Sequence, residues 1–287
     1  MKVIAVVLSG GASRRFQIEG EGWVDKALYP IRGKPMIAHV IDKAARVADE
    51  VVVAVRDRER ALLYERELGV RSVLDDSRLS GPLAGVLGAL RSSVCDKALV
   101  LPNDMPYLEH ALLDHLVASL EDYDVSSPVL PNGLVATTVV AARCSVALWV
   151  LEELTKFPGR SRVADLHRGA PRVALLNAKR RGVHPIALLS INRRESLEKT
   201  VAEYPEGPLD SDVFIERSFT LDDARIGAPS TAGSLWGTLL RGLYLDEFKV
   251  YAERGAFMLA AYALLDSPSS QARELGRLIV SSLKEVS

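Results

Sequence analysis

Cysteine is scarce in this chain, and neither sign of charge is in clear excess. The two cysteines, Cys95 and Cys144, are too few for a disulfide framework or a cysteine-based zinc site, and we expect both to be small buried residues. The formal net charge of -1 among 287 residues gives no overall attraction to nucleic acid or to an anionic membrane. We therefore expect neither as a partner, and any basic binding site must be local.

Long apolar runs are missing as well. The longest, residues 256–265, is well short of the ~20 residues that span a bilayer. Met1 and Lys2 lead directly into a strand pattern, so we expect no targeting leader. With 48% hydrophobic and 25% charged residues, the chain can form both a packed core and a polar surface, which predicts a soluble, cytoplasmic protein.

Short apolar runs, in contrast, recur along the first part of the chain. They are rich in β-branched residues, as strands buried on both faces are, and they cover residues 3–8, 50–55, 70–74 and 97–102. Helical patterns lie between them, over 35–47, 58–68 and 82–93. This alternation predicts an α/β fold with a mostly parallel sheet covered on both faces, in which ligands bind beyond the carboxyl ends of the strands.

The pattern is mixed after about residue 124. We predict strands over 124–131, 134–142, 172–177 and 186–191, and helices over 145–157, 160–168 and 194–204. Residues 204–212 are rich in proline, glycine and acid, so we predict one domain over residues 1–205 and a mainly helical domain of unknown role over 206–287. In the latter, an apolar stripe either packs against the first domain or forms a dimer or partner surface; it consists of Leu275, Leu278, Ile279 and Leu283.

A glycine-rich, basic loop follows the first predicted strand. Gly10 and Gly11 allow a ligand to approach the backbone closely, and loop N–H groups favour an anion. Arg15 offers a forked donor that matches phosphate, and Lys26 a compact positive charge. The spacing fits neither the dinucleotide-binding fingerprint nor a Walker loop. The loop is therefore either a polyphosphate site or a plain strand-to-helix turn.

Five short segments, taken in order, narrow this choice. They are Leu8-Ser9-Gly10-Gly11-Ala12-Ser13-Arg14-Arg15, Asp25-Lys26, Gly81-Pro82-Leu83-Ala84-Gly85, Asp104-Met105-Pro106 and a final segment that begins at Asn192. In this order they resemble the molybdenum cofactor guanylyltransferases of the molybdopterin-guanine dinucleotide biosynthesis protein A type. The resemblance covers about residues 1–205, which are thereby interpreted as a nucleotidyltransferase domain.

The resemblance implies a three-layer α/β/α Rossmann-like sandwich, the nucleotide-diphospho-sugar transferase fold, here with a C-terminal helical extension. It also implies a Mg²⁺-dependent enzyme that transfers GMP from GTP to molybdopterin and releases pyrophosphate. Two anions must meet at the α-phosphorus in such a reaction, so catalysis consists mainly of positioning and charge neutralisation.

The site residues follow from the matching motifs. The catalytic groups are Arg15, Lys26 and Asp104, of which the two cations stabilise charge on the leaving pyrophosphate. The residues expected to bind the nucleotide are Leu8, Ser9, Gly10, Gly11, Ser13, Lys26, Asp76, Gly81, Pro82, Leu83 and Asp104. Asp104 is the expected Mg²⁺ ligand, with Asn192 as a second one, and Arg160 and Arg162 are candidates for the acceptor phosphate.

Some residues depart from the family pattern. Residues 17–24 insert a longer segment before Asp25, Phe16 stands in place of a methionine, and Ala54 stands where an asparagine often contacts the nucleotide. Two alternatives therefore stay open. One keeps the fold but uses CTP or another NTP with a different phosphorylated acceptor, either a cofactor or a sugar phosphate. The other is a non-catalytic nucleotide-binding assembly partner of a molybdoenzyme, and a homodimer through the C-terminal helices is possible in each case.

Overall fold

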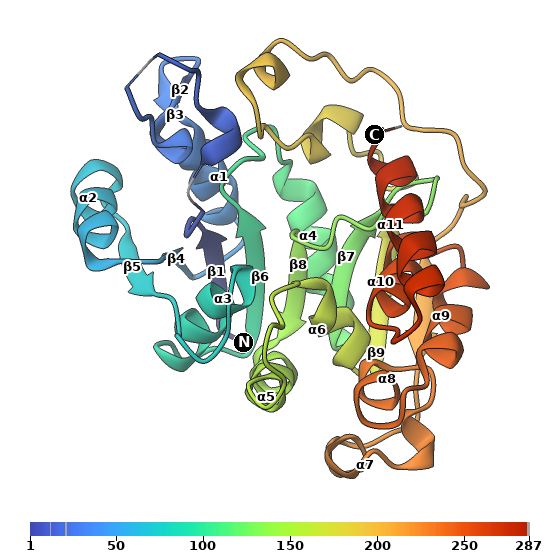
Figure 1. Ribbon diagram of the computed structural model, residues 1–287. Coiled ribbons are helices and arrows are strands. Elements are labelled where there is room, and N and C mark those ends of the chain that lie inside the picture. The colour runs from blue at the N-terminus through green and yellow to red at the C-terminus, as the bar shows by residue number, and fades with distance from the viewer. Residues whose placement is uncertain (12, 21, 286–287) are drawn as a thin grey trace. The chain divides into compact units, whose positions relative to one another are not determined.

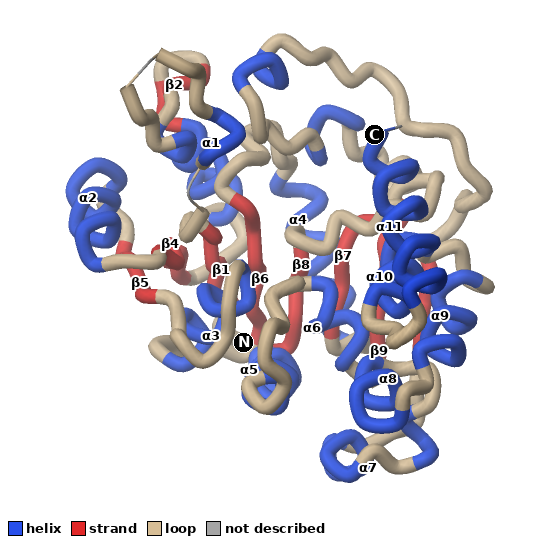
Figure 2. Tube along the Cα trace, in the orientation of Figure 1, coloured by secondary structure: helices blue, strands red, loops and turns tan. Residues whose placement is uncertain are grey.

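The computed structural model describes residues 1–11, 13–20 and 22–285 (Figures 1 and 2). The chain forms two compact units, each built from several segments. Unit 1 comprises Met1–Ala118, Ala141–Arg162 and Val183–Glu203. Unit 2 comprises Ser119–Val140, Val163–Gly182 and Tyr204–Ser287. Within the described ranges, no helix combines the length and apolar character that crossing a bilayer requires.

The centre of unit 1 is a sheet of largely apolar strands. Its strands lie side by side in the order β8 (Val140–Arg143), β6 (Lys97–Pro102), β1 (Val3–Leu8), β4 (Glu50–Val55) and β5 (Arg71–Leu74). β1 pairs in parallel with both β4 and β6, and β4 pairs in parallel with β5. Residues 4–7 of β1 are fully buried, as expected for a strand with helices on both faces.

Helices cover both faces of this sheet (Figure 1). On one face α3 (Pro82–Arg91) packs against α5 (Cys144–Leu154), and on the other α1 (Met36–Ala44) packs against α4 (His110–Ala118). The helix α2 (Arg58–Leu68) packs against β4 and β5. Its ends are set by local chemistry, since Asp57 accepts a hydrogen bond from the Arg60 amide and Gly69 adopts a left-handed conformation. Unit 1 is thus the α/β/α arrangement that the sequence predicts.

Unit 1 also contains several short elements. They are the two-stranded β2 (Pro30–Ile31) and β3 (Lys34–Pro35), and the 3₁₀ helices η1 (Arg14–Phe16), η2 (Lys26–Leu28), η4 (Pro185–Leu188) and η5 (Arg194–Leu197). Two predictions were wrong here. Residues 186–191 begin with η4 instead of a strand, because Pro185 opens a tight turn. The helix predicted over 194–204 is reduced to η5, whose Leu197 packs into a tertiary cluster.

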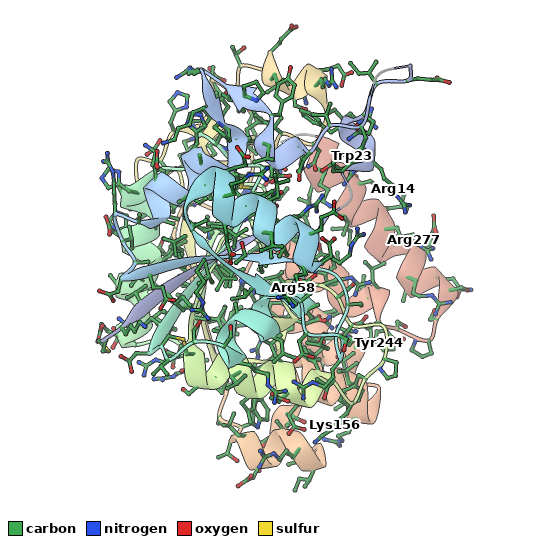
Figure 3. All side chains as sticks on the ribbon, turned by 90° about the vertical axis from the view of Figure 1, so that its left-hand side faces the viewer. Arg14, Trp23, Arg58, Lys156, Tyr244 and Arg277 are labelled. Atoms are coloured by element: carbon green, nitrogen blue, oxygen red, sulfur yellow. A yellow bond between two sulfur atoms is a disulfide. The ribbon has the colours of Figure 1, made fainter. Side chains whose placement is uncertain are left out.

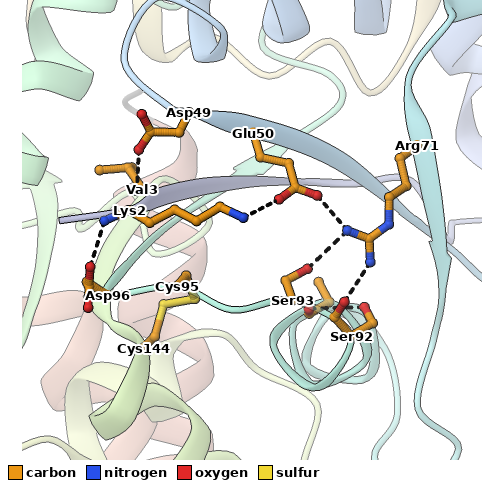
Figure 4. Close-up of a disulfide and its surroundings, with 11 residues drawn as sticks. Lys2, Val3, Asp49, Glu50, Arg71, Ser92, Ser93, Cys95, Asp96 and Cys144 are labelled. Atoms are coloured by element: carbon orange, nitrogen blue, oxygen red, sulfur yellow. Dashed lines mark hydrogen bonds and ion pairs between the residues drawn. A yellow bond between two sulfur atoms is a disulfide. The ribbon is translucent and has the colours of Figure 1, made fainter.

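The expectation that both cysteines are small buried residues needs correction, because Cys144 is buried, Cys95 is only half-buried and the two are bonded. Cys95 and Cys144 form a disulfide with a Cα–Cα distance of 6.1 Å (Figure 4). Cys95 lies in the turn before β6, Cys144 opens α5, and the Cys144 amide donates a hydrogen bond to the Asp96 carbonyl oxygen at 2.9 Å. The partners are 49 residues apart, so only the tertiary fold shows that these segments meet.

Unit 2 contains three strands and the C-terminal helices. β7 (Val125–Val129) pairs in parallel with β9 (Arg172–Asn177), which pairs antiparallel with β10 (Val213–Glu216). The remaining elements are η3 (Ser119–Glu121), α6 (Ala164–Gly169), α7 (Leu221–Ile226), η6 (Pro229–Thr231), α8 (Leu235–Arg241), α9 (Tyr244–Ala252), α10 (Phe257–Leu265) and α11 (Ser270–Glu285). In the predicted apolar stripe of α11, Leu275 and Leu278 are exposed, whereas Ile279 and Leu283 are half-buried.

A buried ionic cluster ties the C-terminal helices to α6. The fully buried Arg168 guanidinium donates hydrogen bonds to Glu247 at 2.7 and 2.8 Å and to Asp266 at 2.6 Å. Asp165 accepts a further one at 3.1 Å. Burial disfavours the charge, but Glu247 and Asp266 outweigh it and raise the pKa of Arg168 well above its ordinary value. Removing one partner would leave buried charge uncompensated, so these helices and α6 are energetically coupled.

Candidate functional site

The glycine loop leaves β1 at the carboxyl edge of the sheet in unit 1. The amides of Gly10 and Gly11 donate to no residue that the structure describes, so they are available to a ligand. Ser13 adopts a left-handed conformation with φ 51° and precedes the right-handed turn η1. A left-handed residue followed by a right-handed one aims successive N–H groups into a concave, anion-binding nest. This backbone supports the predicted phosphate contacts at Gly10, Gly11 and Ser13.

Three of the predicted side chains meet at one point. The Lys26 ammonium donates a hydrogen bond to Asp104 Oδ2 at 2.7 Å and another to Asn192 Oδ1 at 3.2 Å. Lys26 begins η2, and Asp104 lies just beyond β6. The Ile191 amide donates to the Asp104 carbonyl oxygen at 2.8 Å, which holds Asn192 beside the aspartate. The Lys26 and Asp104 side chains are only 11% and 12% exposed, so their charges interact through little water.

The oxygen atoms at this point suit a magnesium ion. Asp104 supplies a carboxylate and Asn192 an amide oxygen, and both of these groups accept a hydrogen bond from the Lys26 ammonium. Mg²⁺ prefers oxygen ligands and commonly takes one or two carboxylates while retaining several waters. In the described part of the chain, no group of three or more His, Cys, Asp or Glu side chains could hold a metal. The fit to Mg²⁺ rests only on the carboxylate of Asp104 and the amide oxygen of Asn192, and the ion itself stays a prediction.

A buried chain of hydrogen bonds connects the glycine loop to this point. Asn103 Nδ2 donates to Ser9 Oγ at 2.7 Å, Ser9 Oγ lies 3.0 Å from Tyr64 Oη, and Tyr64 Oη donates to Asp25 Oδ2 at 2.8 Å. The direction is fixed, because the Asn103 amide nitrogen only donates and the Asp25 carboxylate only accepts. Burial, followed by the Asp25 charge, raises the pKa of Tyr64, which stays protonated. The chain joins the loop, the Asp25-Lys26 motif and the residue before Asp104.

Arg60 fixes the same loop from α2. Its guanidinium donates to the carbonyl oxygens of Ser9 at 3.1 Å and Gly11 at 2.9 Å, and its Nε lies 3.4 Å from Asp25 Oδ2. Arg60 thereby binds the carbonyl oxygens of the loop, while the amides of Gly10 and Gly11 stay available to a ligand. The sequence reasoning missed Arg60 and Tyr64. Their spacing of four residues on one helix face, with one basic and one aromatic member, was the available signal.

The inserted segment 17–24 has an ordered base. Gln17 Nε2 donates to the carbonyl oxygens of Ser13 at 3.0 Å and Val24 at 2.8 Å, and Gln17 Oε1 accepts from the Val24 amide at 2.9 Å. Trp23, near the end of the insertion, is exposed (Figure 3). The centroid of its ring lies 5.8 Å from Arg60 Cζ. The insertion thus leads back to Asp25 through defined contacts.

Phe16, which replaces the expected methionine, is part of a compact apolar cluster. The buried members are Phe16, Ile31, Met36 and Ile191, with Tyr29, Tyr107 and Leu197 packed around them. The Arg194 guanidinium lies 5.7 Å from the Phe16 ring and 5.6 Å from the Tyr29 ring. The cluster joins the segment after the glycine loop to the segment that carries Asn192.

The other predicted residues gather at the start of α3. Gly81 precedes this helix with a positive φ of 58°, and a Cβ there would lie 3.2 Å from Ser161 Cβ. Ser80 Oγ donates to the Arg160 carbonyl oxygen at 3.1 Å. The segment with Arg160 and Arg162 is therefore next to Gly81, Pro82 and Leu83.

The remaining three predicted residues, Asp76, Arg15 and Leu8, do not join these contacts. Arg78 binds the Asp76 carboxylate at 2.9–3.0 Å and also contacts Glu152, so Asp76 is already engaged by the protein. Arg15 is exposed on η1 and has no partner among the described residues, and Leu8 ends β1 beside the loop. The ligand contacts of all these residues stay predictions.

Known proteins provide a comparison for this arrangement. The family model described as "MobA-like NTP transferase domain" matches residues 5–200. A probable molybdenum cofactor guanylyltransferase of Pyrococcus horikoshii is 30% identical over 203 residues, which span 69% of this chain and 98% of that protein. The molybdenum cofactor guanylyltransferase of Shewanella putrefaciens is 33% identical over 135 residues, spanning 46% of this chain and 65% of that protein.

A solved structure supports the fold. The molybdopterin-guanine dinucleotide biosynthesis protein A of Archaeoglobus fulgidus aligns with a TM-score of 0.56 and 22% identity. The alignment covers 68% of this chain and 95% of that one. The predicted Rossmann-like fold class is thereby confirmed.

Proposed function

The chain belongs to the family of MobA-like NTP transferase domains, and we propose that it transfers GMP from GTP to a molybdopterin-type acceptor. Its predicted family and its assignment as a nucleotidyltransferase are confirmed by the matching family model and the curated relatives. The donor, the acceptor and the metal are our proposal. The observation that carries it is the 2.7 Å contact of Lys26 with Asp104, with Asn192 at 3.2 Å.

The reaction requires mainly that the protein position the two phosphate-bearing substrates and neutralise their negative charge. A phosphate oxygen of the acceptor attacks the α-phosphorus of GTP and forms the new P–O bond. The bond from that phosphorus to the bridging oxygen breaks, and pyrophosphate leaves with the electron pair. The attacking phosphate is already ionised, so no general base is required.

Groups of the protein itself would neutralise the negative charge of the phosphates during the transfer. The Gly10 and Gly11 amides bind phosphate oxygens, and Lys26 and Arg15 stabilise the negative charge that grows on the leaving group. Mg²⁺, held by Asp104 and Asn192, would supply further positive charge for the triphosphate. Arg160 and Arg162 would bind the acceptor phosphate. The predicted cytoplasmic location and a homodimer or molybdoenzyme partner at the C-terminal helices stay predictions.

Pyrophosphate release tests this function. Purified protein is mixed with molybdopterin, Mg²⁺ and GTP, CTP, ATP or UTP in turn, and we expect fast release with GTP only. Asp104→Asn keeps the shape of the side chain but removes its charge, and should abolish turnover. Because the variant leaves the nearly buried Lys26 ammonium without its ion pair, its melting temperature should fall, and turnover is measured at a temperature where circular dichroism shows the variant to be folded. If CTP were used in preference to GTP, the proposed donor would be wrong and CTP would take its place. Binding of nucleotide without turnover would favour a role as an assembly partner.

A further inference from the structure

Asp75 has an unusual position in unit 1. It directly follows β5, and its amide donates to the Val55 carbonyl oxygen at 2.9 Å. A Cβ placed on Gly10 would lie 2.9 Å from Asp75 Oδ2, and one placed on Gly85 would lie 3.1 Å from Oδ1. The carboxylate therefore occupies space that two glycines leave open, between the glycine loop and α3.

This carboxylate lacks partners in the protein. Among residues 1–11, 13–20 and 22–285, no hydrogen bond or ion pair reaches the Asp75 carboxylate, whereas the carboxylate of the neighbouring Asp76 is bound by Arg78. Burial raises the pKa of Asp75, and the charge of Arg56 opposes that effect. A half-buried acceptor without donors is costly, and a ligand that brings N–H groups would relieve the cost.

The nucleobases differ in the donors they can bring. An ionised carboxylate only accepts hydrogen bonds, through two oxygens side by side. The Watson–Crick edge of guanine carries two adjacent N–H donors, on N1 and N2. Adenine and cytosine place an amino donor next to a ring acceptor, which would face a carboxylate oxygen. Guanine is therefore the base whose edge matches an unpaired carboxylate.

We propose that Asp75 accepts both guanine N–H groups and thereby selects GTP. The inference rests on the proposed function, because it assigns the base in the same nucleotide site. Asp75 is a specificity residue in this account, since it contacts the base and none of the reacting atoms. A site built to pair with a donor rejects analogues that lack it.

The test compares GTP with ITP, which lacks the N2 amine, and with XTP, which has a carbonyl at that position. We expect the wild type to use GTP about 10- to 100-fold better than ITP, the loss of one hydrogen bond to a charged group. Asp75→Asn turns one acceptor into an N–H donor that fits the xanthine carbonyl. Its preference should invert, with kcat/KM for XTP exceeding that for GTP by about tenfold or more.

Asp114→Asn, at an exposed position of α4, is the control variant, and its ratio of GTP to XTP use should equal that of the wild type. Asp76→Asn tests whether the neighbouring carboxylate contacts the base instead. An unchanged ratio in Asp75→Asn, or a change confined to Asp76→Asn, would overturn the proposal. So would equal use of GTP and ITP by the wild type, a measurement that needs no variant to fold. If Asp75→Asn instead alters discrimination between GTP and dGTP, the carboxylate binds the ribose and the proposal is wrong.

Binding measurements separate this inference from the proposed function. Melting-temperature shifts with GTP, ITP and XTP require neither acceptor nor turnover. If XTP raises the melting temperature of Asp75→Asn more than GTP does, while no pyrophosphate is released, the base assignment stands and the transferase proposal is wrong. If GTP is turned over but the variant shifts as the wild type does, the transferase stands and the base assignment falls.

Discussion

At the residue scale, the pairing of Lys26 with Asp104 sets the electrostatics of the site. The two side chains are nearly buried and their charges cancel, so together they attract a triphosphate only weakly. A divalent cation on Asp104 would change the sum from zero to two positive charges and leave Lys26 available to phosphate. We therefore expect nucleotide binding to depend strongly on Mg²⁺, which melting-temperature shifts with GTP in the presence of Mg²⁺ or of a chelator would measure.

Tyr64 gives a residue-scale prediction about positioning. Tyr64→Phe removes the hydroxyl that links Ser9 to Asp25, leaving both polar groups without that partner. We expect a loss of about 1–3 kcal/mol in the free energy of unfolding. Because the glycine loop and the residue before Lys26 lose their link, KM for GTP should rise more than kcat falls. Urea unfolding and steady-state kinetics measure both, and an unchanged KM would show that the hydroxyl has only a structural role.

At the element scale, α6 carries three buried charged or titratable side chains, Asp165, His167 and Arg168, and His167 yields a pH prediction. His167 is fully buried with its Nε2 2.6 Å from Ser127 Oγ, and burial lowers its pKa from 6.5 to about 4. Between these pH values the unfolded chain binds a proton that the folded chain does not. Stability is therefore complete above pH 6.5 and decreases on acidification, by about 3 kcal/mol near pH 4.

Urea unfolding at several pH values between 7 and 4 tests this, with His167→Gln as the comparison. Between pH 7 and 4 the free energy of unfolding of the variant should fall much less than that of the wild type, since glutamine does not titrate. Equal slopes for the two proteins would place the acid sensitivity elsewhere.

The disulfide gives a second element-scale prediction, since it joins the turn before β6 to the first residue of α5. Closing a loop of 49 residues restricts the unfolded chain and is worth about 4 kcal/mol. The double variant Cys95→Ser, Cys144→Ser should lose stability of that order, and reductant should lower the melting temperature of the wild type alone. Two titratable thiols in the native, unreduced protein would contradict the bond.

At the scale of the whole molecule, the sequence was most informative where motifs follow buried strands. Lys26 and Asp104 are expected to act on one nucleotide because of the motif resemblance, and Asp104 also follows β6 at the carboxyl edge of the sheet. The structure brings the two side chains together, and their roles stay predictions. Arg60, Tyr64 and the Cys95–Cys144 bond could not be assigned in this way. They depend on contacts between distant segments, and such contacts leave no periodic pattern in the sequence.

The errors in secondary structure have the same origin. Residues 186–191 are apolar enough for a strand, but Pro185 and the packing near Asp104 make the segment a turn. In β10, Val213 and Ile215 are buried and Phe214 and Glu216 are exposed, an alternation that the helical character of the surrounding residues concealed. At residues 186–191 tertiary context overrode local propensity. The short β10 is consistent with its local pattern, but it pairs with β9, which is distant in sequence.

The most direct test of the central claim is a double-mutant cycle on pyrophosphate release with Lys26→Met and Asp104→Asn. If both side chains act on one nucleotide, each single variant should lower kcat/KM at least about 100-fold, and the double variant should lose far less than the product of the two losses. Multiplying losses, or Mg²⁺-dependent turnover retained by Asp104→Asn, would show that the two residues do not share a nucleotide.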